Sequence, residues 1–204
     1  MEMQFPNQDL IKNTMLDLRY EIDIHGQPAE IFPWLKQLGY HRGGWYIDTW
    51  WDEFEQKYFW PFVVPEDARG TFNPPANEIL AQYQDLSIGD IVPDGPPDSA
   101  FYEVVALEEN HLLQLYATTH FNYIAPQFVY KTRYAPKGAF CWAFILERLD
   151  GRTTRLVSWW RSEGYPRTFF YLLKPVISII DSAHQRAILR GIKKRVEGKR
   201  GRSS

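Results

Sequence analysis

The 204-residue sequence has little of what marks disulfide-bonded, metal-binding or membrane-spanning proteins. Its single cysteine, Cys141, excludes an internal disulfide and a metal site built from several cysteines. No run of about 18 apolar residues occurs, so no membrane-spanning helix is expected. The first ten residues, MEMQFPNQDL, lack the basic and apolar regions of a secretory signal. Together these absences predict a cytoplasmic protein.

Sequence motifs for metal and cofactor chemistry are also missing. The histidines stand at positions 25, 41, 111, 120 and 184, and no two have the spacing of a zinc-binding helix. No phosphate-binding glycine loop, dinucleotide fingerprint or nucleophile elbow occurs. We therefore expect neither a metal nor a cofactor.

Aromatic residues, by contrast, are abundant: the chain has 8 Trp, 12 Tyr and 13 Phe within a hydrophobic share of 45%. A chain of this length forms one domain more readily than two, and it can bury a sizeable core. Large rings bury much area but leave irregular gaps unless they are packed carefully. The composition therefore fits either the lining of a cavity or a filled aromatic core.

Charge is distributed unevenly along the chain, although the net charge is only −2. Residues 45–110 carry 14 acids against 2 bases, and the last twenty residues hold 8 bases. A basic end can contact nucleic acid or an anionic membrane, or it can be a solvated helix end whose cations suit the helix dipole. Because the acidic middle would repel a polyanion, we expect no nucleic-acid partner and leave peripheral contact with an anionic membrane open.

Alternating apolar residues predict an antiparallel sheet. The run from Leu18 to Ile24 alternates with charged residues, which indicates a half-buried strand. The same pattern predicts a short strand and two hairpins, over 88–92, over 101–107 with 112–118, and over 139–148 with 154–161.

Two main helices are expected. The first begins at Pro28, should be kinked or divided by Pro33, and should end at Gly39. The second runs from Pro175 to Val196. Gly191 lies inside it at some energetic cost, which indicates close approach by another element. The expected inward stripe of the second helix is Val176, Ile180, Ala183, Ala187 and Ile192.

This order of elements predicts a single α+β domain over residues 1–204, in which a curved antiparallel sheet wraps around a long C-terminal helix. The expected core covers about 16–197. Two irregular aromatic insertions, near 47–78 and 119–138, interrupt it, and the first is expected to form either a lid or part of the core.

Several short words in the sequence resemble one superfamily. They are PAEIFPWL at 28–35, GYHRGGWY at 39–46, LSIGDIVPDG at 86–95, WAFILE at 142–147 and LRGIKKR at 189–195. In their order and spacing the chain resembles the SRPBCC, or START-like helix-grip, superfamily, in its uncharacterised, polyketide cyclase/dehydrase-like bacterial branch. The resemblance implies a helix-grip fold with a cup between the sheet and the terminal helix. It implies no particular reaction, because one fold hosts many functions.

The segment His41–Asp48 contains the first group of candidate site residues. Arg42 can bind a carboxylate or phosphate through two parallel hydrogen bonds, and Trp45 and Tyr46 offer flat apolar walls. Tyr46 and Asp48 are candidates for proton transfer. Alternatively, the two glycines make a turn, the rings fill the core, and Asp48 pairs with Arg42.

The second group of candidates lies on and near the predicted strands. Trp142 and Phe144 share a face with Phe140, and Tyr116 is expected beside them on a neighbouring strand, so these rings line a cavity or form plain core. Arg161, at a strand end, meets an anionic ligand group or is an ordinary exposed arginine. His120 is the best isolated proton shuttle, or else a loop histidine without a catalytic role.

Three functions stay open. The favoured one is the binding or carrying of a hydrophobic small molecule in the cavity, because clusters of acid–base residues are scarce. The second is an enzyme of polyketide cyclase or dehydratase type that uses Tyr46, Asp48, Arg42 or His120 in the same cavity. The third is a membrane-surface or protein-interaction module that uses residues 169–173 and the basic end of the last helix.

Overall fold

The computed structural model describes residues 4–47, 57–58, 66, 74–123, 127–130 and 132–200. The strands are β1 (Leu16–His25), β2 (Ile91–Pro93), β3 (Phe101–Glu108), β4 (Leu112–Ala117), β5 (Lys137–Arg148) and β6 (Thr153–Tyr165). The helices are α1 (Pro28–Lys36), α4 (Gln127–Tyr130) and α5 (Arg167–Arg200), and short 3-10 segments are η1 (Gln8–Leu10), η4 (Ala81–Tyr83) and η5 (Thr119–Tyr123).

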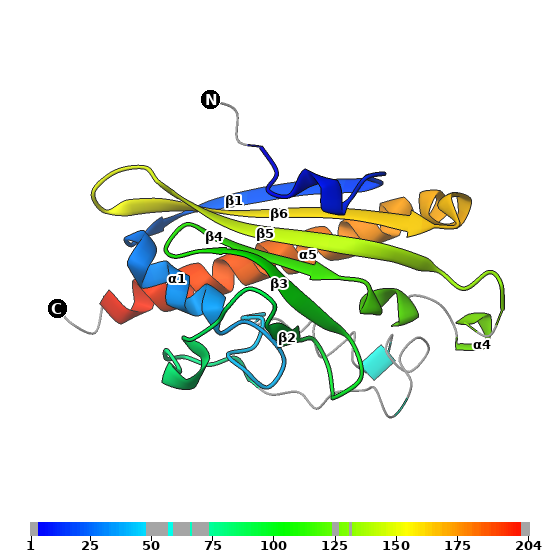
Figure 1. The fold of residues 1–204 in the computed structure, drawn as a ribbon. Coiled ribbons are helices and arrows are strands. Elements are labelled where there is room, and N and C mark those ends of the chain that lie inside the picture. Colours follow the sequence, from blue (N-terminus) through cyan, green and yellow to red (C-terminus); the bar gives the residue numbers. More distant parts are fainter. Residues whose placement is uncertain are drawn as a thin grey trace.

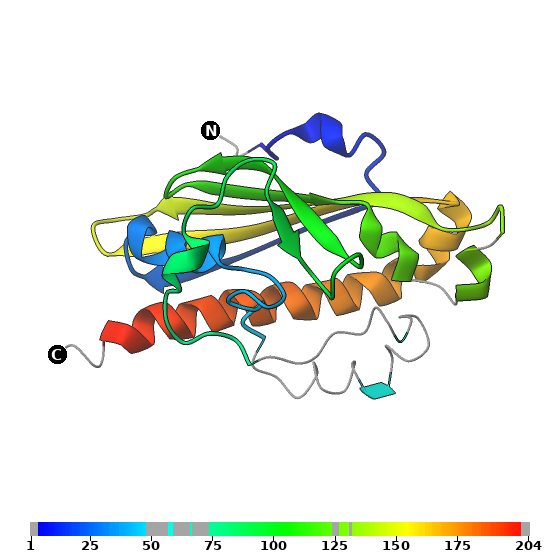
Figure 2. The ribbon, with the colours of Figure 1, turned by 60° about the horizontal axis from the view of Figure 1, so that its bottom comes forward.

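All six strands form one antiparallel sheet in the order β1-β6-β5-β4-β3-β2 (Figure 1). The long helix α5 runs along one face of this curved sheet, and the N-terminal segment with η1 lies on the other face (Figure 2). We call these two faces the concave and the convex face. The predicted α+β architecture is therefore confirmed. Of the helices in the described part of the chain, none combines the length and hydropathy needed to cross a bilayer.

Strand β1 follows the predicted alternation and pairs with β6 along its whole length. Leu18 and Ile24 pack in the core on the concave face. Asp23 lies on the convex face, where its carboxylate accepts a 2.8 Å hydrogen bond from the Arg155 guanidinium on β6. The charged residues of the alternation thus pair across the sheet surface.

Both predicted hairpins are present, and the second is longer than expected. Its turn is held by Asp150, whose carboxylate accepts 2.7 Å hydrogen bonds from the backbone N–H groups of Arg152 and Thr153. The predicted strand at 88–92 is reduced to β2. Gly89 has a φ of +92°, which interrupts the extended backbone, so the regular register with β3 begins at Ile91, although the Gly89 N–H still donates a 2.8 Å hydrogen bond to the Val104 carbonyl of β3.

Helix α1 begins as predicted. Gln27 and Glu30 form a capping box in which the Glu30 carboxylate accepts a 2.6 Å hydrogen bond from the Gln27 N–H. Pro33 was expected to kink or divide the helix, but the helix is continuous. The proline removes one intrahelical hydrogen bond, and burial of the apolar side compensates for it. The buried side chains are Ile31, Phe32, Trp34 and Leu35.

Helix α5 begins at Arg167, so the predicted start at Pro175 is wrong. Pro175 leaves the carbonyl of Tyr171 without its intrahelical partner, and Tyr171 lies at an exposed position of the helix. The predicted inward stripe is also wrong for the first half of the helix, because Val176 is 55% exposed and Ala183 is exposed. The buried residues are instead Phe170, Gln185, Ile188, Leu189, Gly191, Ile192, Arg195 and Val196.

The two predicted insertions differ in what the structure describes. Most of the first, 47–78, lies outside the described residues. The second, 119–138, contains η5 and α4, and its last residues already belong to β5.

Candidate functional site

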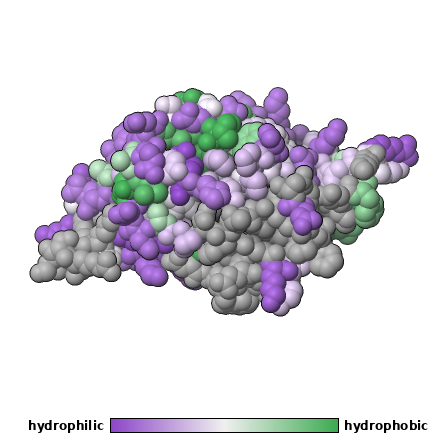
Figure 3. Space-filling view, turned by 90° about the horizontal axis from the view of Figure 1, so that it is seen from below, coloured by the Kyte–Doolittle hydropathy of each residue, from purple (hydrophilic) through white to green (hydrophobic). Residues whose placement is uncertain are grey.

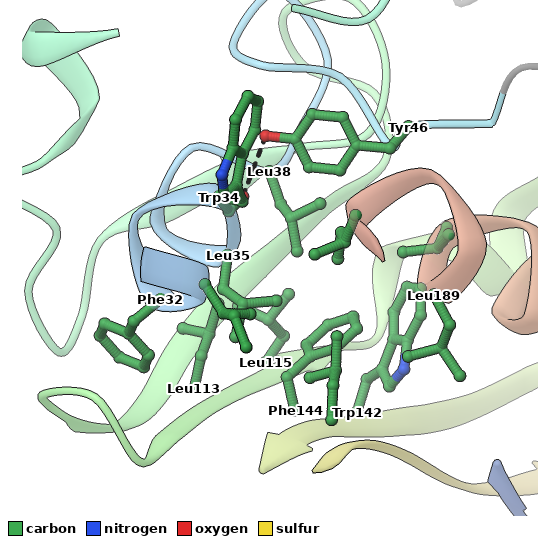
Figure 4. Packing of buried hydrophobic residues seen from close by; sticks show 14 of the residues in the cluster. Phe32, Trp34, Leu35, Leu38, Tyr46, Leu113, Leu115, Trp142, Phe144 and Leu189 are labelled. Atoms are coloured by element: carbon green, nitrogen blue, oxygen red, sulfur yellow. Dashed lines mark hydrogen bonds between the residues drawn. The ribbon is translucent and has the colours of Figure 1, made fainter. Parts of the chain in front are cut away.

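The concave face divides into two halves of different chemistry. Near α1, in the half that we call the aliphatic half, leucines pack around the rings of Trp34 and Phe144 (Figure 4). There α1, β4, β5 and α5 bring together Leu35, Leu113, Leu115, Phe144 and Leu189, all fully or almost fully buried. The candidate residue Phe144 is therefore part of a filled core.

The other half, toward η5, holds six rings that we call the aromatic cluster. In order they are Trp45, Tyr102, His120, Phe140, Trp160 and Trp142. Each ring contacts the next at centroid distances between 4.4 and 5.6 Å, and the last contacts the first. Trp45 and Phe140 are only half-buried and Trp160 is 7% exposed, so this half is less completely closed than the aliphatic half.

Helix α5 presents polar side chains to the aromatic cluster. The buried side chain of Gln185 accepts a 2.8 Å hydrogen bond from Ser158 on β6, and Ser158 accepts one of 2.8 Å from the indole N–H of Trp142. Asp181 lies one turn earlier on the same side of the helix. Burial, and then the charges of Asp94 and Asp181, raise the pKa of the Tyr102 hydroxyl. An aromatic sheet face opposite a polar helix face differs from a closed hydrophobic core.

Three buried N–H donors in this region have no hydrogen-bond partner among the residues that the structure describes. They are the indole Nε1 of Trp45, the indole Nε1 of Trp160 and the amide Nε2 of Gln185. An unpaired buried donor costs about 1–3 kcal/mol. An acceptor atom of a bound molecule that reached one of these donors would recover that free energy.

The candidate proton shuttle His120 is oriented by a carboxylate. Its Nε2 lies 2.8 Å from a carboxylate oxygen of Asp94. This contact joins η5 to the turn after β2. The His120 side chain is 15% exposed, and its Nδ1 is buried without a partner. With Nε2–H donated to Asp94, Nδ1 carries the lone pair, as in a general base held by a carboxylate.

Two candidate residues, Tyr116 and Arg161, lie on the convex face, and the expectation that Tyr116 stands beside Trp142 is therefore wrong. Tyr116 stands opposite Cys141 in the β4–β5 register and packs in the convex cluster. Arg161 donates a 2.8 Å hydrogen bond to Asp17 and lies over the ring of Phe5. Both positions follow from strand parity, because neighbouring residues point to opposite faces.

Tyr46 has a structural role, because its side chain holds the segment before it against α1. It is fully buried, and its hydroxyl donates a 3.0 Å hydrogen bond to the Trp34 carbonyl (Figure 4). Burial raises the pKa of this hydroxyl further above its usual range, which is unfavourable for proton transfer at neutral pH. The predicted close approach at Gly191 is confirmed, because a Cβ there would lie 2.0 Å from the Tyr46 carbonyl oxygen.

Arg42 and the two glycines after it shape the turn that precedes Trp45. The Arg42 guanidinium donates a 2.8 Å hydrogen bond to the Lys36 carbonyl and stacks on Tyr83, and burial lowers its pKa below the usual range. A Cβ at Gly43 would lie 2.7 Å from Gln37 atoms. These contacts favour the structural interpretation of this motif, in which the glycines make a tight turn.

Asp48 lies outside the described residues. No group of three or more His, Cys, Asp or Glu side chains that could hold a metal occurs among the residues that the structure describes.

Sequence reasoning missed Trp160, Tyr102, Asp94 and Gln185, which all belong to this site. Tyr102 was one aromatic residue among many in a predicted hairpin, and Asp94 was interpreted only as part of a turn. Gln185 could have been found from the sequence, because it is a polar residue at helical spacing from the buried Ile188 and Ile192.

The order of elements along the chain decides the fold. One strand and a short helix are followed by five further antiparallel strands, and a long terminal helix lies against the concave face. This chain has the helix-grip fold. The predicted resemblance to the SRPBCC superfamily is thereby confirmed at the level of the fold.

Comparisons with solved structures found distant likenesses. A protein from Arthrobacter aurescens shares 12% identity over 90% of this chain and 87% of its own, with a TM-score of 0.48. Norcoclaurine synthase from Thalictrum flavum shares 12% over 96% and 95%, with a TM-score of 0.46. A polyketide cyclase-like protein from Corynebacterium glutamicum shares 14% over 93% and 95%, with a TM-score of 0.41. No family model and no curated protein matched the sequence.

Proposed function

We propose that the protein binds a hydrophobic small molecule against the aromatic cluster, on the concave face of the sheet. The supporting observation is the set of unpaired buried donors, Trp45 Nε1, Trp160 Nε1 and Gln185 Nε2, among aromatic rings and opposite a polar helix face. A closed core gains nothing from such donors, whereas a binding site uses a few polar groups to orient an apolar ligand.

The aromatic rings would supply most of the binding free energy. A ligand that buries about 400 Å² of apolar surface gains ~10 kcal/mol, part of which is lost to the cost of association. The unpaired donors add a requirement for at least one acceptor atom, such as a carbonyl, ether or hydroxyl oxygen. We therefore expect a lipid, polyketide or isoprenoid-like compound that carries oxygen.

Native mass spectrometry of the protein purified from its own host tests this proposal. We expect a co-purifying mass that is released by organic solvent and rebinds to the emptied protein. Trp160→Phe keeps a ring but removes the indole donor, so it should weaken rebinding about 3- to 10-fold. Trp159→Phe, a change on the convex face, is the matched control and should leave affinity unchanged. An empty protein that binds no apolar extract would contradict the proposal.

A second candidate function is acid–base catalysis on the bound molecule, and the Asp94–His120 pair favours it. The buried Nδ1 of His120 lies in the aromatic cluster and would act as the base, and Asp94 would stabilise the imidazolium formed when it takes a proton. Tyr46 no longer fits this role, because its hydroxyl is buried and hydrogen-bonded to Trp34.

Conversion of the rebound ligand tests catalysis separately from binding. Wild-type protein should turn the ligand over to a product of changed retention or mass, and Asp94→Asn and His120→Gln should slow turnover at least about 100-fold. Both variants should keep ligand affinity within a few-fold. Equal turnover by wild type and both variants would remove His120 as the base and leave binding as the function.

A further inference from the structure

The side of α5 that faces away from the sheet changes character along the helix. Residues spaced by three or four positions share one side of a helix. In the first half of α5 these outward residues are Leu172, Val176, Ile179 and Ala183, and in the second half they are Arg186, Arg190 and Lys194. We call these seven residues the outward stripe.

The apolar half of the outward stripe is strongly exposed. Leu172 is 81% exposed, Ile179 is 70% exposed, and Val176 between them is more than half exposed. Exposed large aliphatic residues that occur singly need no explanation, but three on one side of one helix mark an interaction surface. Viewed from below, the hydrophobic residues form separate groups within a mainly hydrophilic surface (Figure 3).

The basic half of the outward stripe requires a partner that carries negative charge. Arg186, Arg190 and Lys194 are all exposed, although the Arg186 side chain bends back toward the sheet, where its guanidinium lies 4.7 Å from the centre of the Tyr20 ring of β1. Helix α5 as a whole has nine Lys or Arg residues against the two acids Asp181 and Glu197. Asp181 lies on the inward side of the helix. A partner that matches the outward stripe must therefore be apolar over one half and anionic over the other.

We propose that the outward stripe docks on an anionic lipid membrane, a property that goes beyond ligand binding and does not depend on it. The stripe is about 33 Å long at 1.5 Å per residue. Its apolar half would enter the boundary between headgroups and acyl chains, and its basic half would lie against anionic headgroups. A bilayer surface offers these two environments within a few ångström of each other.

A second copy of this chain matches the stripe less well. If two stripes paired along their length as antiparallel helices, the apolar half of each would cover the basic half of the other. Pairing through the apolar halves alone would bury only Leu172, Val176 and Ile179 of each chain, far less than a stable dimer buries. Charge complementarity therefore favours the membrane.

Co-sedimentation of the full-length protein with lipid vesicles tests the proposal. We expect binding to phosphatidylcholine vesicles that contain about 30% phosphatidylglycerol, and little binding to phosphatidylcholine alone. Raising the salt from about 0.1 M to about 1 M shortens the screening length from about 10 Å to about 3 Å and should weaken binding. The pair Arg190→Gln with Lys194→Gln should weaken it about 25-fold, at about fivefold per cation.

The apolar half is tested by a second, independent pair. Leu172→Ser with Ile179→Ser should weaken vesicle binding at least about tenfold, because the inserted area is lost. Ile88→Ser with Ile91→Ser changes two other exposed aliphatic residues, at and just before β2. Lys12→Gln with Arg152→Gln removes two exposed cations elsewhere. Both control pairs should leave binding unchanged.

The outcomes that would overturn the proposal are distinct. They are no vesicle binding by the wild-type protein, equal loss of binding in the control pairs, or retained binding in both stripe pairs. Sedimentation velocity covers the alternative of a second copy: a wild-type dimer that Leu172→Ser with Ile179→Ser converts to monomer would assign the stripe to self-association. All four pairs change exposed residues, so the thermal unfolding of these variants should match that of the wild type. The two stripe pairs test the proposal independently of each other.

Discussion

Replacing Gly191 with alanine should destabilise the protein, although alanine is a better helix former than glycine. Gly191 lies inside α5 at the point where the backbone of Tyr46 crosses the helix. A Cβ there would meet the Tyr46 carbonyl oxygen at 2.0 Å and the Tyr46 Cβ at 2.8 Å. Optimal carbon contacts are about 3.5–4.0 Å, so the two segments would have to separate by more than about 1 Å.

The structure limits how far Tyr46 can move to relieve this clash. Its hydroxyl is hydrogen-bonded to the Trp34 carbonyl, and the Arg195 guanidinium lies 4.8 Å over its ring. Overpacking of this kind costs about 1–3 kcal/mol, and the gain in helix propensity offsets at most ~1 kcal/mol of it. We expect a net loss of up to about 2 kcal/mol, or roughly 4–8 °C in Tm for a domain of this size.

Gly198→Ala provides the matched control, because it lies in the same helix and a Cβ there meets nothing within 4 Å. That change should stabilise the protein by up to about 1 kcal/mol. Urea unfolding followed by tryptophan fluorescence measures both variants. If Gly191→Ala were as stable as Gly198→Ala, the packing of Tyr46 against α5 would be wrong.

Three further changes probe other parts of the fold. Ser158→Ala should cost about 1–3 kcal/mol for each buried group that it leaves unpaired, Trp142 Nε1 and Gln185 Oε1, and urea unfolding would measure the loss. Burial raises the pKa of the Cys141 thiol to about 12, so this thiol should react with a disulfide reagent at pH 8 only as fast as the protein unfolds. The hydrogen bond from Arg155 lowers the pKa of Asp23 in the folded protein. The ion pair therefore stabilises the fold at any pH above the unfolded pKa of about 3.8, and this stabilisation is lost as the pH falls through the pKa of the folded state. Asp23→Asn should lower Tm at pH 7 and not at pH 2.

The strands were predictable because their signals are local. Asp150 binds the backbone of its own turn, and the residues from Leu18 to Ile24 alternate between core and surface within a single strand. The start of α5 was not, because a proline can either begin a helix or lie inside one, and which of the two occurs depends on the surroundings of the carbonyl that it leaves without a partner, here that of the exposed Tyr171. That exposure depends on the tertiary structure.

The site was less predictable, since its contacts join residues far apart in the sequence. The face of Tyr116 depends on its register opposite Cys141, and β4 is buried on both faces, so its apolar pattern does not show which side points to α5. The pairing of Asp94 with His120 joins a turn to a 3-10 segment, and neither segment has a pattern that predicts the other. Trp45 and His120 were found because their residue types stood out, and their joint membership of one cluster emerged only from the fold.

The failed stripe prediction and the two proposals have the same physical origin. Val176 and Ile192 stand 16 residues apart, so they point about 160° away from each other around α5, and the apolar side of the helix changes from outward to inward along its length. A helix that only closed a core would keep its apolar side inward throughout. Where α5 faces the aromatic cluster it turns Gln185 and Asp181 inward instead, which leaves Val176 and Ile179 outward. Ligand binding and membrane docking thus use opposite sides of one helical segment, so Trp160→Phe should affect only the first and a change of Ile179 only the second.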